Sequence, residues 1–187
     1  MKNLIVFSTL FISFYTFSQE KGSNSDTRNF IDNAEITQVN KDWNEVAEFK
    51  SGLAETVAFF PVEAINLKSK EKVNALQMDM DVLYNISGKN YRYFKSSWID
   101  LEEIDEFINF IEQYIIPNID NKTDKRKSTT YIFNSKEIVF HFRIEKNKRR
   151  ISIYLKDYGS TDYDHYFWTE SQVNNIPKLL EMLKKIK

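Results

Sequence analysis

Hydrophobic residues recur at every second position in the middle of the chain. From Val73 to Val82, leucine, methionine and valine alternate with glutamine and aspartate, which predicts a strand with one buried and one solvent-facing side. A turn region at residues 85–88 follows it. The same reasoning predicts four further strands, at residues 90–98, 129–133, 138–145 and 151–155. Residues 146–149, three of which are basic, lie between the last two and predict a hairpin turn.

Three other segments show the spacing of three or four residues that is typical of an amphipathic helix. The first ends near Gly52, a residue suited to a helix C-terminus, although residues 45–49 also alternate as a strand would. The second ends at Pro117. The third lies at the C-terminal end of the chain. Their apolar stripes consist of Ile36, Val39, Trp43 and Val46, then Ile104, Phe107, Ile108, Ile111 and Ile115, and finally Leu179, Leu180, Leu183 and Ile186. The polar residues 19–34 predict a flexible lead-in.

The two late helices begin with similar residues. Asp100 and Glu103 form the pattern of a capping box in the first, and Thr169 and Gln172 form it in the second. Apolar residues flank both boxes in the positions of a hydrophobic staple. Two explanations compete for this likeness. Caps of this kind are common at helix starts and arise independently, whereas an internal duplication of a strand-hairpin-strand-helix unit would give both helices the same start.

The shared order of elements favours the duplication, with pseudo-repeats at about 53–118 and 122–187. Pro177 departs from the first copy, because a proline costs about 3 kcal/mol inside a helix. We therefore expect the last helix to be kinked, or to restart near Asn175 with Pro177 in its first turn.

These elements predict an α+β fold in a single domain at residues 35–187. Both repeats would contribute strands to one antiparallel sheet, with the two late helices on one face. The uncovered face of that sheet would carry Asp79, Asp81, His141, Arg143, Tyr154 and Lys156.

The N-terminal end has the pattern of a secretory signal peptide. Lys2 provides the charged start, Leu4 to Phe17 the apolar stretch, and Thr16 and Ser18 the small residues before a cut at Gln19. A retained anchor is the alternative, but a spanning helix needs roughly 20 apolar residues. We therefore expect residues 1–18 to be removed, leaving a secreted or periplasmic protein without a membrane span.

The chain contains no cysteine. This composition excludes disulfides, which support many small secreted domains, and it excludes the lipid-bearing cysteine of a bacterial lipoprotein. Aromatic residues make up 15% of the chain, and large rings bury much surface per residue. We therefore expect stability to come from the hydrophobic core alone.

Candidates for catalysis are weak. The chain has no Gly-x-Ser-x-Gly motif and two histidines, which argues against nucleophilic hydrolysis. Asp79 and Asp81 lie about 7 Å apart on one strand face, a spacing compatible with acid–base work on a glycoside, although alternating acids on a strand are mostly solvated. Oxygen and nitrogen ligands gather at Asp157, Asp162, Asp164 and His165, but their order does not match a calcium loop. We predict no metal and no cofactor.

Charge is strongly segregated along the chain. Residues 99–120 contain seven acids and no base, whereas residues 121–156 contain eleven bases and three acids. Helix-dipole complementarity and protection of sheet edges explain part of this pattern. The rest is interpreted either as solvated faces, the usual origin of charge runs, or as a site for an anionic partner. The candidate binding residues are His141, Arg143, Lys146, Lys148, Arg149 and Arg150. Nucleic acid is not expected, because no recognition motif accompanies the bases.

The sequence thus predicts an exported, non-catalytic protein that is monomeric or weakly associating. It would bind an anionic surface or another envelope protein through its sheet face or basic hairpin. The alternative is a secreted hydrolase of envelope or extracellular polymer that uses carboxylates.

Overall fold

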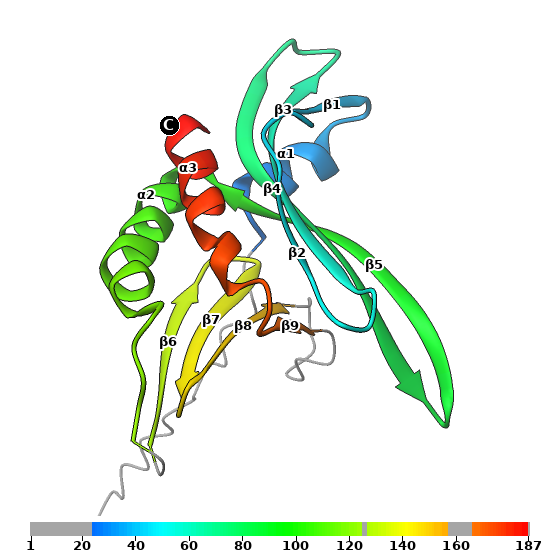
Figure 1. Ribbon diagram of the computed structural model, residues 1–187. Helices are drawn as coiled ribbons and strands as arrows, with labels where there is room; N and C mark the ends of the chain where they lie inside the picture. The colour runs from blue at the N-terminus through cyan, green and yellow to red at the C-terminus, as the bar shows by residue number, and fades with distance from the viewer. Residues whose placement is uncertain (1–23, 125–126, 157–165, 187) are drawn as a thin grey trace, which may run out of the picture.

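The computed structural model describes residues 24–124, 127–156 and 166–186. These residues form two antiparallel sheets and three α-helices (Figure 1), so the predicted α+β class is confirmed. The strands form two sheets, where we expected one. Alternation along a strand fixes which side is buried but does not identify the strand's neighbour, and for that reason the sequence did not reveal the division.

Sheet A contains β1 (Thr37–Lys41), β2 (Ala47–Lys50), β3 (Thr56–Asn66), β4 (Lys72–Ile86) and β5 (Lys89–Asp100). Both β1 and β2 pair with the same edge of β3, and β4 and β5 follow in order. Pro61 lies in β3 between these two paired segments, where its carbonyl accepts the Asp42 N–H at 3.0 Å. The missing N–H of proline therefore costs no ladder hydrogen bond.

Sheet B is a meander of four strands that pair in chain order. They are β6 (Ser128–Asn134), β7 (Ile138–Glu145), β8 (Lys148–Leu155) and β9 (Tyr166–Thr169). The hairpin predicted at residues 146–149 is confirmed, with Lys146 and Asn147 in its turn.

Two helices lie in the angle between the sheets (Figure 1). One is α2 (Leu101–Phe110), which continues through a π-helical segment (Ile111–Ile115) and a 3-10 turn (Ile116–Asn118). The other is α3 (Ile176–Ile186), preceded by a 3-10 turn (Val173–Asn175). A shared hydrophobic core joins both sheets to these helices. Within it, the Phe107 ring of α2 stacks on Phe133 of β6 at 4.6 Å.

The helix predicted from residue 36 to Gly52 is wrong, because this segment forms β1 and β2. Ile36, Val39 and Trp43 are 50%, 37% and 69% exposed. Their helical spacing therefore reflects scattered surface residues, which carry no information about a buried face.

The predicted lead-in also differs from expectation, because α1 (Asp26–Asn33) forms within it. The Ser25 hydroxyl caps this helix by accepting the Arg28 N–H at 3.0 Å. Ile31 of α1 packs against a small apolar cluster on sheet A that includes Phe60 and Trp98.

The two late helices begin differently. Glu103 accepts the backbone N–H of Asp100 at 3.1 Å, so this half of the first predicted capping box forms. The box predicted at Thr169 does not cap α3, which begins seven residues later, and the Thr169 hydroxyl donates to the Lys50 carbonyl at 2.9 Å. Pro177 is the second residue of α3, as the restart predicted. The internal duplication is not confirmed and stays a prediction.

The predicted signal peptide at residues 1–18 lies outside the described residues. Among the helices that are described, none is long and apolar enough to cross a membrane.

Candidate functional site

Strand alternation separates two sets of side chains on sheet B. Ile138, Phe140, Phe142 and Ile144 of β7 are buried toward α2 and α3, so the residues between them point the other way. We call this second side the outer face. Its described side chains include Ile132, His141, Arg143, Glu145, Lys148, Arg150, Ser152, Tyr154, Tyr166 and Trp168.

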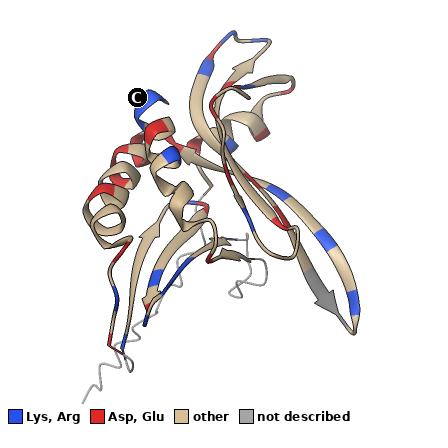
Figure 2. Cartoon of the chain, viewed as in Figure 1, with Lys and Arg blue, Asp and Glu red and all other residues tan. Residues whose placement is uncertain are grey.

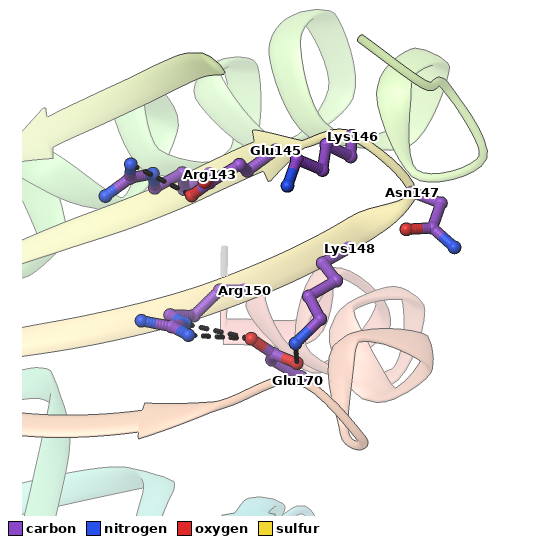
Figure 3. Close-up of a pocket in the computed structure, with 7 residues that line it drawn as sticks. All are labelled: Arg143, Glu145, Lys146, Asn147, Lys148, Arg150 and Glu170. Carbon is purple, nitrogen blue, oxygen red and sulfur yellow. Dashed lines mark hydrogen bonds and ion pairs between the residues drawn. The ribbon is translucent and has the colours of Figure 1, made fainter. Parts of the chain in front are cut away.

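The register of β7 and β8 gathers the basic residues at one end of this face. Arg143 lies directly opposite Arg150, and Glu145 lies opposite Lys148. Figure 2 shows this basic end of the hairpin and the acidic α2 in the same view. A depression of about 220 Å³ opens among the side chains of Arg143, Glu145, Lys146, Asn147, Lys148, Arg150 and Glu170 (Figure 3).

Two glutamates pair with three of the basic side chains that line the depression. Glu170 accepts Arg150 Nη2 at 2.7 Å and Nε at 3.2 Å, and Lys148 Nζ lies 3.7 Å from its other oxygen. The hydrogen bonds from Arg150, supported by the nearby Lys148 charge, lower the pKa of the Glu170 carboxyl. Arg143 pairs with Glu145 at 3.0 Å. Four cations thus line the depression with two acids, leaving an excess of positive charge.

Aromatic rings lie beside these cations on the same face. The Arg150 guanidinium lies 4.5 Å from the Trp168 ring centre, within cation–π range. Farther along the strands, Tyr154 and Tyr166 stack at 5.4 Å and His141 contacts Tyr154 at 4.7 Å. Trp168 and Tyr166 were missed as site residues, although the alternation in Tyr166-Phe167-Trp168 places both opposite the buried Phe167.

His141 occupies the middle of the outer face, across from Ile132 on β6. Partial burial disfavours the charged imidazolium and lowers the pKa of His141. This histidine is therefore mainly neutral at pH 7, and it adds a ring to the face but little charge.

Arg149 is separated from the other five candidate residues. Its Nη2 donates to the Asp120 carbonyl at 2.7 Å and its Nη1 to the Asn147 carbonyl at 3.1 Å. Its register partner is Ile144, one of the core-facing residues. The structure brings together the other five, which are His141, Arg143, Lys146, Lys148 and Arg150. Arg149 instead forms hydrogen bonds on the opposite side of the hairpin.

The predicted uncovered face is divided between the two sheets, because Asp79 and Asp81 belong to β4 of sheet A. Asp79 accepts Lys41 Nζ, the Ser96 hydroxyl and Gln77 Nε2, each at 2.6 Å. Asp81 accepts Arg92 Nε at 2.6 Å. A cation pairs with each carboxylate, an arrangement that fits a structural role better than acid–base catalysis.

The predicted cluster at Asp157, Asp162, Asp164 and His165 lies outside the described residues. Elsewhere, oxygens of Asp26, Asp100 and Glu102 lie close enough together to suggest a cation site. Lys136 Nζ occupies the space between them, at 2.6 Å from Glu102 and 2.9 Å from both aspartates. These contacts, the one with Glu102 first, raise the pKa of Lys136, so its ammonium neutralises the cluster.

A buried network at Glu137 was not predicted. The Glu137 carboxylate, 3% exposed, accepts the Ser25 N–H and hydroxyl, two nitrogens of Arg28 and the Trp98 N–H. It therefore links α1 and β5 to the turn between β6 and β7 of sheet B. The contacts join residues up to 112 positions apart, and no local sequence pattern marks them.

The chain matches no protein-family model and no curated protein. The geometry of the outer face therefore carries the functional argument.

Proposed function

We propose that this chain is an exported, non-catalytic binding protein that holds an anionic partner on the outer face of sheet B. The observation that carries the proposal is the direct cross-strand pairing of Arg143 with Arg150 at the rim of the depression. Like charges placed opposite each other destabilise a sheet. An anion bound between them would relieve this repulsion.

The arrangement of the glutamates supports this proposal. Glu145 and Glu170 each contact one of the two arginines, which reduces the side-chain entropy lost on binding. Guanidinium groups fixed in this way suit planar anions such as carboxylates and phosphates, which accept paired hydrogen bonds. Lys146 and Lys148 add charge that steers an anion toward the same place.

The test replaces the two arginines with a neutral residue of similar length. The Arg143→Gln/Arg150→Gln double variant is compared with Lys68→Gln/Lys72→Gln, which removes the same charge from two lysines that also pair with glutamates. The probes are polygalacturonate, polyaspartate and phosphatidylglycerol vesicles, each titrated at low salt and at roughly 0.15 M salt.

We expect the wild type and the lysine variant to bind at least one probe, and more weakly as salt rises. The arginine variant should bind that probe about tenfold more weakly or worse, since hydrogen bonds to charged groups contribute about 1.5–3 kcal/mol each. Equal binding by both double variants, or no binding of any probe by the wild type, would overturn the proposal.

A further inference from the structure

The outer face places aromatic rings and fixed charges next to one another. The Trp168 ring lies under the Arg150 guanidinium, and the stacked Tyr154 and Tyr166 lie farther along the same strands. From Lys148 to Tyr154 the face extends about 20 Å, at about 3.4 Å per strand residue. A surface of this length contacts several units of a polymer at once.

The charged part of the face offers both donors and acceptors of hydrogen bonds. Arg143 and Arg150 donate, whereas Glu145 and Glu170 accept. A polymer rich in hydroxyl groups uses both kinds of partner, because each hydroxyl donates and accepts. A phosphate backbone offers acceptors and few hydroxyl donors, so it would use the arginines but would leave Glu145 and Glu170 without a donor.

We infer that the anionic partner is an acidic polysaccharide, an inference that rests on the proposed function. Its sugar rings lie on Tyr166 and on the part of Trp168 that the Arg150 guanidinium leaves exposed, and its carboxylates meet Arg143 and Arg150. Sugar rings present flat faces of C–H groups to aromatic side chains, whose electron-rich faces attract positively polarised groups.

The exposure of the outer face favours a polysaccharide over a lipid bilayer. Its most exposed large apolar side chains are Ile132, Tyr166 and Trp168, at 50%, 47% and 37%, and the Arg150 guanidinium covers part of the indole. Membrane insertion relies on apolar side chains that enter the interface. Three such side chains beside four cations and two acids offer little apolar area for insertion.

The test measures the contribution of ring stacking separately from that of charge, by changing the ligand and by changing the aromatic residues of the protein. By isothermal titration, the full mature chain is offered polygalacturonate, which has sugar rings and carboxylates, and polyaspartate, which has carboxylates alone. Dextran, single-stranded poly(dT) and phosphatidylglycerol vesicles complete the set. The ring variants are Tyr166→Ala and Trp168→Leu, with Tyr91→Ala on β5 of sheet A as the matched control.

We expect polygalacturonate to bind more tightly than every other probe. Each ring variant should weaken that binding about two- to tenfold. Tyr166→Ala, which does not contact the arginines, should leave polyaspartate binding unchanged, and the control should change neither. If Trp168→Leu does not fold by circular dichroism, Tyr166→Ala and the order of the wild-type affinities decide the matter.

Several results would overturn the inference. Equal affinity for polyaspartate, with ring variants that behave as wild type, would leave an anion-binding face without recognition of sugars. Tighter binding of poly(dT) or vesicles would assign the face to a nucleic acid or a membrane. Equal affinity for dextran, or no binding of any polyanion, would overturn the proposed function as well.

Discussion

The carboxylate of Glu137 offers the sharpest test of what holds the fold together. It accepts Ser25 Oγ and Arg28 Nη2 at 2.6 Å, Arg28 Nε at 2.8 Å, Trp98 N at 3.0 Å and Ser25 N at 3.1 Å. The Glu137→Gln variant preserves the shape of the side chain but removes its charge, and it turns one acceptor into a donor. At least one donor of α1 or β5 then loses its partner in a buried site.

Breaking one side of a buried ion pair costs about 3–5 kcal/mol. At about 2–4 °C per kcal/mol for a domain of this size, Glu137→Gln should lower the Tm by roughly 10 °C. The matched control is Glu145→Gln, because Glu145 is 51% exposed and pairs with an exposed arginine. Exposed pairs contribute at most about 1 kcal/mol, so the control should stay within a few degrees of the wild type.

Urea titration followed by circular dichroism measures both variants. The Arg28→Met/Glu137→Leu double variant should be more stable than Glu137→Leu alone, because it removes the unpaired charge along with its partner. A Glu137→Gln free energy of unfolding within about 1 kcal/mol of the wild type would falsify the view that this network fastens α1.

Three further predictions concern the ends of the chain and its response to pH. N-terminal sequencing of the exported protein should give Gln19 as the first residue, and a mature chain that starts at Met1 would contradict the proposed export. Burial opposes ionisation of Asp100, but the hydrogen bonds from Lys136, Thr27 and Asp26 outweigh it and lower the Asp100 pKa. Its charge therefore adds stability above the unfolded pKa of about 3.9, and the gap between wild type and Asp100→Asn should narrow as the pH falls below that value. Because the pKa of His141 is lowered in the folded protein, the unfolded chain binds a proton at this histidine at higher pH than the folded protein does. The free energy of unfolding of the wild type should therefore decrease as the pH falls below about 6.5. The His141→Gln variant should lack the part of this decrease that comes from His141.

The elements that the sequence predicted well are those with one buried and one open side. In β4, Met78 and Met80 are fully buried, while Asp79 and Asp81, which follow them, are only partly buried, so the alternation was visible. The strand β3 lacks this signal, because the adjacent Phe59 and Phe60 pack on opposite sides of sheet A and both are buried. A strand that is covered on both faces shows no alternation of apolar and polar residues, so its sequence does not reveal it.

The candidate site was predictable as a composition but not as a surface. The basic hairpin was visible at Lys148 and Arg150, and the alternation that buries Ile151 already places Arg149 on the other side of β8. Only the pairing of β8 with β9 brings Glu170 into contact with Arg150. The network at Glu137 forms when α1 packs against residues more than 100 positions away in the sequence. Contacts of this kind produce no periodic pattern of apolar residues that could predict them.

The separation between Ser25 and Glu137 also bears on when the protein folds. The start of α1 cannot complete its contacts until β7 is available, 112 residues later. For a chain exported as proposed, with its N-terminus leading, this order of events keeps the first helix undocked during most of the passage. Under that proposal the fold would close only after passage, because contacts between distant segments form late.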